Sequence, residues 1–213
     1  MTTESWLFRP VSVGTFMGGM VGSSLIDNWL NVSSGYTTGL RFGWDHSHYW
    51  GLEMQFTYAK MGLRDSAWAK AERGEWYIDR GIAADDPSLD RLVNTRRNLQ
   101  VYQAAVSVMY YPWGDARWRP YLSLGFGGAR MQYTDIFMSG GQAGFFVLPI
   151  ALGVKYQWSD RLALRFECSD SISVPGDSGL NTVNNFAFNG ALELRLGGSR
   201  VGYWPWNPGR SYW

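Results

Sequence analysis

The stretch Arg161-Leu162-Ala163-Leu164-Arg165-Phe166-Glu167-Cys168-Ser169 alternates strictly between two kinds of side chain. Apolar residues occupy positions 162, 164, 166 and 168, and alanine, arginine, glutamate and serine stand between them. Successive side chains of a β-strand point to opposite faces, so this period of two predicts a strand with two unlike faces. The segment 186–196 repeats the pattern, with phenylalanine and leucine opposing alanine, asparagine, glutamate and arginine.

The polar faces of these strands predict an interior rather than a solvated surface. They are poor in lysine and rich in glycine, alanine, serine and charges of opposite sign. Such faces fit a crowded polar lumen, which leaves the apolar faces to point outward. This inverted arrangement is typical of a β-barrel that is surrounded by lipid.

Eight segments carry strand patterning, and together they predict an all-β, eight-stranded antiparallel up-and-down transmembrane barrel. The segments are 10–21, 36–45, 50–61, 98–111, 119–133, 144–158, 161–169 and 186–196. In the fifth segment the alternation slips after Gly127-Gly128, which predicts a β-bulge there. Pro149 in the sixth segment and the glycines of the fifth are expected to weaken the wall locally.

The connections alternate between short and long. Short turns are expected at 45–49, 112–118 and 159–160, and longer loops at 22–35, 62–97, 134–143 and 173–183. This asymmetry predicts short periplasmic turns, long external loops and both termini in the periplasm. The expected organisation is an N-terminal periplasmic segment (1–9), the barrel (10–197) and an aromatic, proline-rich tail (198–213).

The composition excludes several other classes of protein. No segment approaches the roughly 20 consecutive apolar residues of a membrane helix. The formal net charge of +1 argues against a nucleic-acid partner. The 12 Trp, 12 Tyr and 11 Phe suit the aromatic belts of a membrane protein. Cys168 belongs to the apolar face of its strand and is expected to contact lipid as a small hydrophobic residue.

The segments 39–45, 50–54 and 161–167 resemble strands of the small eight-stranded bacterial outer-membrane barrels of the OmpA, OmpX, OmpW and opacity-protein type. The resemblance covers 11–196 and implies the bacterial outer membrane as the location and outer-membrane lipid as the surroundings. The start Met1-Thr2-Thr3-Glu4-Ser5 lacks the features of a signal peptide, so we expect that an export signal has been removed from this chain. The family commonly ends its last strand on an aromatic residue, whereas this strand is expected to stop near Leu196.

Several charged residues are expected to point into the lumen. An eight-stranded barrel encloses space that side chains just fill, and buried charges must pair. The favoured interpretation is a structural salt-bridge network; the alternative is a gated ion path in which the pairs rearrange. The residues are Arg41, Glu53, Lys155, Arg165, Glu167, Glu193 and Arg195.

The loop 62–97 and the tail are candidate contact surfaces for other envelope proteins or subunits. The loop carries charges of both signs and is expected to contain a short helix over 67–77. It is either a recognition loop or a solvated extension of the wall. The candidate contact residues are Trp68, Trp76, Tyr203, Trp204, Trp206, Tyr212 and Trp213.

No catalytic, cofactor or metal site is predicted. Some outer-membrane barrels are enzymes that use histidine with serine or a carboxylate at the outer rim. The two histidines of this chain, His46 and His48, lie in an expected periplasmic turn, where ordinary turn chemistry is the simpler interpretation.

Three functions remain open from the sequence. The first is a non-enzymatic barrel that anchors the envelope or recognises a surface through its loops and tail. The second is a narrow channel or an OmpW-like transporter of small apolar solutes. The third is a soluble lipid-binding barrel such as a lipocalin, which inward charges disfavour.

Overall fold

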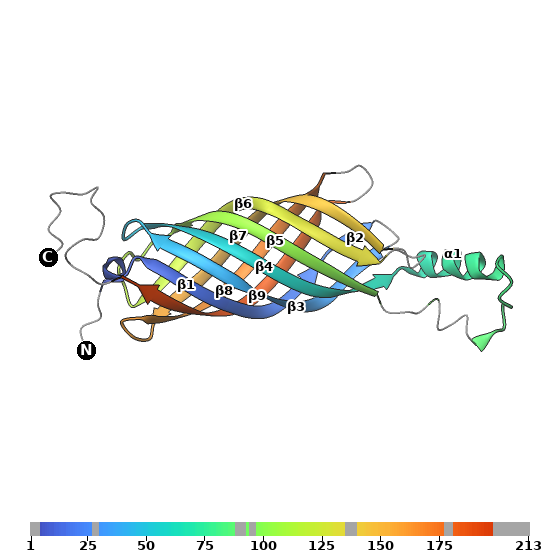
Figure 1. Ribbon diagram of the computed structural model, residues 1–213, viewed down its shortest axis with the longest axis horizontal. Coiled ribbons are helices and arrows are strands. Elements are labelled where there is room, and N and C mark those ends of the chain that lie inside the picture. Colours follow the sequence, from blue (N-terminus) through green and yellow to red (C-terminus); the bar gives the residue numbers. More distant parts are fainter. Residues whose placement is uncertain are drawn as a thin grey trace.

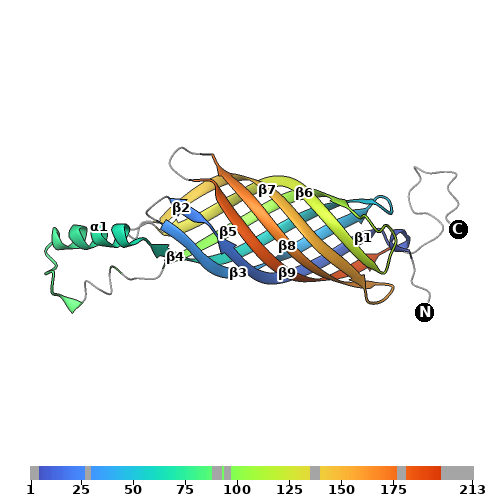
Figure 2. The ribbon, with the colours of Figure 1, turned by 180° about the vertical axis from the view of Figure 1, so that it is seen from behind.

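The computed structural model describes residues 5–26, 30–87, 93, 97–134, 140–176 and 181–197. These residues form a closed barrel of eight long antiparallel strands (Figure 1). The first long strand pairs with both the second and the last, which closes the sheet on itself. The strands cross the barrel obliquely on both sides, as the view from behind shows (Figure 2). The predicted fold class is confirmed.

The strands follow the order of the sequence around the barrel. A three-residue strand, β2, continues β1 as a short hairpin with β3. The elements are η1 (Trp6–Phe8), β1 (Val11–Gly22), β2 (Ser24–Ile26), β3 (Leu30–Asp45), β4 (Trp50–Asp65), α1 (Ala67–Ile78), β5 (Arg97–Tyr110), β6 (Trp118–Thr134), β7 (Gly140–Gln157), β8 (Leu162–Pro175) and β9 (Val183–Leu196).

The two ends of the barrel differ as expected. The turns β3–β4, β5–β6 and β7–β8 lie at one end, where β1 begins and β9 ends, and we call this the turn end. Helix α1 projects beyond the opposite end, the loop end (Figure 1). The hydroxyl of Ser66 caps α1 by accepting a hydrogen bond of 3.1 Å from the amide of Ala69. The predicted short helix is therefore confirmed, with one residue more at its C-terminus.

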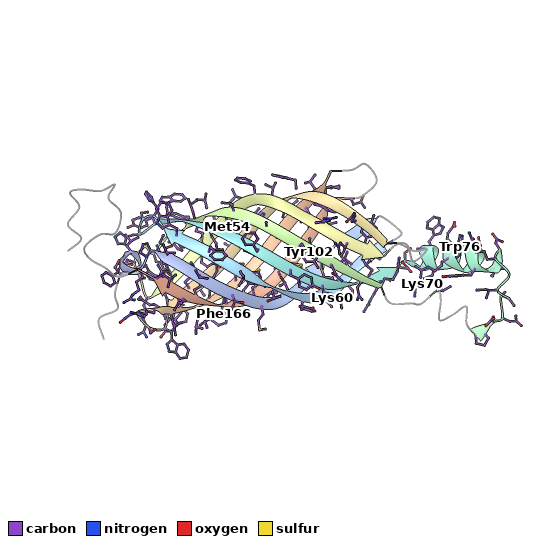
Figure 3. All side chains as sticks on the ribbon, in the orientation of Figure 1. Met54, Lys60, Lys70, Trp76, Tyr102 and Phe166 are labelled. Carbon is purple, nitrogen blue, oxygen red and sulfur yellow. The ribbon has the colours of Figure 1, made fainter. Side chains whose placement is uncertain are left out.

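The outer wall is apolar and bordered by aromatic rings. Phe126, Phe166 and Phe188 expose about 60% of their surface: 62%, 58% and 63%. Figure 3 shows Met54, Tyr102 and Phe166 on the outside of the barrel. At the turn end the rings of Trp118 and Tyr156 lie 4.5 Å apart. At mid-height and toward the loop end, outward rings again form pairs, Tyr36–Tyr58 at 6.2 Å and Tyr58–Tyr102 at 5.2 Å.

The predicted bulge after Gly127-Gly128 is wrong. Strand β6 keeps one register with β5 from Tyr110↔Leu122 to Leu99↔Tyr133. Gly128, Arg130 and Gln132 continue the outward-facing row of β6 toward the loop end without an extra residue. The apparent slip arises because the apolar band of the outer wall ends here and polar residues take over the same face.

The strands are longer at the loop end than the sequence pattern indicated. Strand β3 begins at Leu30, β4 continues to Asp65, β7 begins at Gly140 and β8 ends at Pro175. The expected loops 22–35, 134–143 and 173–183 are therefore partly strand. In β4 the added residues have their apolar side chains inward, the reverse of the pattern on which the strands were predicted, and those of β3 and β7 are rich in serine and glycine.

The lumen has two layers, whereas the sequence predicted a polar lumen throughout. Charged side chains fill the part near the turn end. Near the loop end the inward-facing residues are mostly apolar and many outward-facing ones are polar, for example Lys60, Arg130 and Gln132, so the apolar face of the strand changes sides there. The apolar lumen cluster consists of Met20, Val32, Ala59, Met61, Leu63, Leu99, Val101, Ala129, Met131, Ala143, Phe145, Val147, Val183 and Ala187.

No helix in the described part of the chain is long and apolar enough to span a membrane.

Candidate functional site

Arg165, the fourth residue of β8, lies at the centre of the charged layer. Its guanidinium donates to Glu167 at 2.5 Å and to Glu193 at 3.1 Å, and it forms two hydrogen bonds to Glu53. The three carboxylates come from β4, β8 and β9. One fully buried cation therefore joins three strands, because the alternation of each strand turns its charged residue inward.

Two further basic residues complete this layer. Arg41 on β3 forms a bidentate pair with Glu167, at 2.9 and 2.6 Å. Lys155 on β7 lies 3.2 Å from the carboxylate of Glu193. The hydroxyl of Tyr121 donates to Glu167 at 2.6 Å and accepts from Arg165. Each carboxylate thus has at least one cationic partner, which offsets the cost of burying it.

A second charged group lies closer to the turn end, around Asp45. Its carboxylate accepts hydrogen bonds from Arg195 at 2.6 Å, from Arg119 at 2.9 Å and from the hydroxyl of Tyr111 at 2.9 Å. Arg119 also donates to the carbonyl groups of residues 47 and 48 in the adjacent turn. This group therefore ties the turn β3–β4 to strands β6 and β9.

The N-terminal segment closes the turn end as a cap. Trp6 in η1 is only 1% exposed, and its ring lies 4.5 Å from the guanidinium of Arg195. Its amide donates to Asp115 and its indole nitrogen to the carbonyl of Ala116, both at 2.8 Å. Arg195 in turn donates to the carbonyl of Trp6 at 2.8 Å. Trp6 thus joins the buried interior at the turn end and holds residues 5–9 against the barrel.

The seven sequence-predicted lumen residues are therefore all buried, and the structure brings them together in this region. Sequence reasoning missed Asp45, Arg119, Tyr111, Tyr121 and Trp6. Four of them carry the inward phase of their strands to or just past the strand end, so extending the alternation would have found them. Trp6 lies in a short 3-10 helix, where no period exists.

A third charged cluster anchors the long loop. Asp65, the last residue of β4, pairs with Arg73 of α1 and with Arg97, the first residue of β5. Arg73 also donates to the carbonyl of Val93 at 3.0 Å. All three side chains are almost completely buried. The loop is therefore fixed at its base by a built core.

The candidate contact residues differ in their placement. Trp68 on α1 is 49% exposed, and Trp76 is partly exposed with the guanidinium of Arg80 3.4 Å from its ring centre. Tyr203, Trp204, Trp206, Tyr212 and Trp213 lie outside the described residues.

The two histidines lie at the turn end. His48 Nδ1 is 3.7 Å from an oxygen of Asp115, and the ring of His46 packs on Trp44 at 5.4 Å. Among the described residues, no group of three histidine, cysteine or acidic side chains is arranged to hold a metal ion.

Comparisons with known proteins agree with this geometry. The model of the outer membrane protein beta-barrel domain family matches residues 8–193. A search of curated proteins finds no match.

Solved structures share the fold at low sequence identity. Neisserial surface protein A is similar with a TM-score of 0.57 and 13% identity, covering 87% of this chain and 97% of that one. OprG of Pseudomonas aeruginosa has a TM-score of 0.52 and 12% identity, with coverages of 92% and 98%. Ail of Yersinia pestis, solved with the heparin analogue sucrose octasulfate, has a TM-score of 0.51 and 11% identity, with coverages of 88% and 99%.

The structure is a closed antiparallel barrel with an apolar exterior and a charged lumen, and one family model matches most of the chain. That family resides in the bacterial outer membrane. The chain belongs to the outer-membrane β-barrel domain family.

Proposed function

We propose that this protein is a non-enzymatic outer-membrane barrel that presents the loop between β4 and β5 for recognition at the cell surface. The observation that carries the proposal is the buried cluster Asp65–Arg73–Arg97 at the base of the loop. A loop that merely extends the wall into solvent does not need a buried ionic cluster at its base. Burying three charges costs free energy, and here that cost fixes the position of the loop. The cluster holds α1 beyond the loop end, which faces the exterior in this family.

Because the lumen is filled, a function carried out by the outer surface of the protein is favoured over transport through the lumen. The charged layer, the group around Asp45 and the Trp6 cap follow one another toward the turn end. Their hydrogen bonds and ion pairs are largely mutual, so opening a path would unpair several charges at once. This favours a structural network over the gated ion path.

The exposed surface of α1 indicates the chemistry of recognition. Trp68 offers a large ring that is half in solvent, and the exposed Glu72 stands one helical turn further on the same face of α1. Tryptophan is enriched among the residues that contribute most to protein–protein binding. The aromatic tail remains a predicted second contact surface for envelope partners.

Binding by cells that display the protein tests the proposal. The probes are purified extracellular-matrix proteins and an array of neutral and sulfated glycans, including sucrose octasulfate because Ail was solved with it. We expect binding to at least one probe, and loss of that binding in Trp68→Ser and when 67–96 is replaced by a glycine-serine linker. Trp113→Ser removes an exposed tryptophan, 66% exposed, at the turn end and serves as the control.

Two results would overturn this proposal. One is binding that survives in the linker variant. The other is the absence of binding to every probe although surface labelling shows normal display.

A second candidate, passage of small apolar solutes through the wall, is favoured by one break in the sheet. Strands β6 and β7 pair continuously except opposite Pro149 and Leu148, where Gly125 and Phe126 have no partner in the register. Proline has no amide hydrogen to donate to the neighbouring strand. The break lies where the charged layer gives way to the apolar lumen cluster, whose methionines can change conformation readily.

Uptake of an apolar fluorescent solute into liposomes that contain the protein separates the two candidates. Transport predicts uptake above protein-free liposomes and a reduction in Pro149→Ala, which restores the missing donor. Uptake equal to protein-free liposomes would reject transport and leave the recognition proposal in place.

A further inference from the structure

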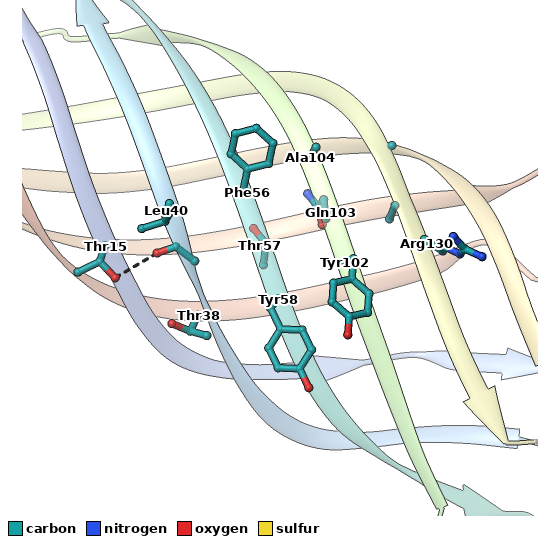
Figure 4. A pocket seen from close by; sticks show the side chains of 13 residues that line it. Thr15, Thr38, Leu40, Phe56, Thr57, Tyr58, Tyr102, Gln103, Ala104 and Arg130 are labelled. Atoms are coloured by element: carbon teal, nitrogen blue, oxygen red, sulfur yellow. Dashed lines mark hydrogen bonds between the residues drawn. The ribbon is translucent and has the colours of Figure 1, made fainter. Parts of the chain in front are cut away.

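A groove crosses the outer wall where the apolar band meets the polar rim of the loop end. It has a volume of about 690 Å³. Its floor is made of small residues on neighbouring strands, namely Thr15, Thr38, Gly39, Ala104 and Gly128. Larger outward side chains, Leu40, Phe56, Tyr58 and Tyr102, form its walls (Figure 4).

The groove is hollow because small residues stand in one register row. Ala104 of β5 pairs with Phe56 of β4 on one side and with Gly128 of β6 on the other. A Cβ atom added at Gly128 would meet its nearest neighbour, the carbonyl oxygen of Phe145, only at 3.8 Å. The position therefore has room for a side chain that the sequence does not supply.

A cation borders this apolar groove. Arg130 stands in the next register row, Tyr58↔Tyr102↔Arg130, and its exposed guanidinium donates to Gln142 on β7. Lys60 lies one outward step beyond Tyr58 on β4 (Figure 3). Within the described part of the chain, neither Arg130 nor Lys60 has an acidic partner within ion-pair distance.

An arginine and a lysine on the lipid-facing wall need a counter-charge from outside the protein. The other ionic clusters of this barrel bring carboxylates to their cations, whereas this row offers glutamine and tyrosine. A guanidinium binds a phosphate group in bidentate geometry, and tyrosine rings prefer the boundary between acyl chains and headgroups. The apolar groove thus matches the acyl chain of a lipid, and the cations beside it match the phosphate of the same lipid's headgroup.

We propose that this groove is a binding site for an anionic, phosphate-bearing lipid of the outer leaflet. One acyl chain lies on Ala104 and Gly128 between Phe56 and Tyr102. The headgroup phosphate contacts Arg130, with Lys60 as a second cation. The site is independent of the surface-recognition role, since it lies on the membrane wall and not on the loop.

Native mass spectrometry of the purified full chain tests the site with two lipids that differ in charge, phosphatidylglycerol and phosphatidylcholine. We expect the wild-type protein to retain phosphatidylglycerol in preference. Arg130→Gln should weaken that binding about tenfold, which is the range of a charge-assisted hydrogen bond to a phosphate. Arg161→Gln removes an exposed arginine at the turn end and should leave binding unchanged.

Filling the hollow gives a second test that does not touch the charge. Gly128→Leu should abolish retention of the lipid. Its control is Gly190→Leu, because Gly190 also faces lipid, on β9, and an added Cβ there meets no atom within 4 Å. Heat-modified gel migration checks that each variant is folded.

Three results of the lipid-binding measurements would overturn the proposal. They are equal binding of the two lipids by the wild-type protein, equal loss in Arg130→Gln and Arg161→Gln, and full binding by a folded Gly128→Leu. A wild-type dimer that becomes monomeric in Gly128→Leu would also overturn it, because the groove would then be the contact surface for a second copy of the chain.

Discussion

At the scale of single residues, Arg165 decides how the charges of the lumen are satisfied. It contacts Glu53, Glu167 and Glu193, whereas Glu167 and Glu193 each have a second cation, Arg41 and Lys155. Glu53 has no second cation among the described ion pairs. Removal of Arg165 therefore leaves the carboxylate of Glu53 without a cationic partner, and leaves Glu167 and Glu193 with one cation each.

This asymmetry predicts a specific coupling. Arg165→Gln should lower the free energy of unfolding by about 3 to 5 kcal/mol, the usual cost of breaking a buried ion pair. Adding Glu53→Gln should recover part of the lost stability, since it removes the unpaired carboxylate while Glu167 and Glu193 keep Arg41 and Lys155. Denaturant unfolding in lipid vesicles measures both variants. A double variant less stable than Arg165→Gln would contradict this assignment.

Asp170 is the opposite case, a carboxylate on the lipid-facing wall. It stands on β8 between Ile150 and Phe186, and its Oδ1 atom is buried without a hydrogen-bond partner. A charge on this face is unfavourable in lipid, by less for a carboxylate than for a basic group. Asp170→Asn should therefore raise the free energy of unfolding by up to about 1 kcal/mol. The same change at Asp160, in the turn β7–β8, should have no effect in the same unfolding assay.

At the scale of elements, the sequence predicts the strands best where one face is apolar and the other is charged. Strand β8 is the clear case, and its phase places Arg165 and Glu167 in the lumen correctly. Prediction failed where the apolar face turns from the outside to the lumen, as in β4 near Met61, because the alternation continues there with the opposite phase. It also failed at Trp6, whose burial depends on contacts with Asp115, Ala116 and Arg195, all distant in sequence.

The loop is the element whose order depends most on one residue. Asp65 accepts both Arg73 and Arg97, so Asp65→Asn should release α1 from the barrel end. Amide hydrogen exchange over Ala67–Ile78 should accelerate about tenfold or more, the equivalent of one lost hydrogen bond to a charged group. Exchange in β5 to β9 should change little. Glu72→Gln, an exposed change on the same helix, is the control; equal acceleration there would show that the cluster does not anchor the loop.

At the scale of the whole molecule, the barrel is closed in two different ways along its axis. Toward the loop end, a cluster of buried apolar side chains occupies the lumen. Toward the turn end, paired charges fill it and the cap covers them. Because each section is closed by its own interactions, stability and impermeability should respond separately to a change in either one.

Trp6→Ala tests this separation directly. Loss of the buried ring should lower the free energy of unfolding by about 3 to 5 kcal/mol, the usual cost of removing a buried tryptophan. Ion flux through liposomes that contain the variant should nevertheless stay at the background level, because the pairs around Arg165 still fill the lumen beyond the cap. Denaturant unfolding and a planar-bilayer conductance measurement, with Trp113→Ser as the control, follow the two effects. Steady conductance in Trp6→Ala would mean that the cap alone seals the barrel, and the charged layer would then be a path for ions instead of a wall.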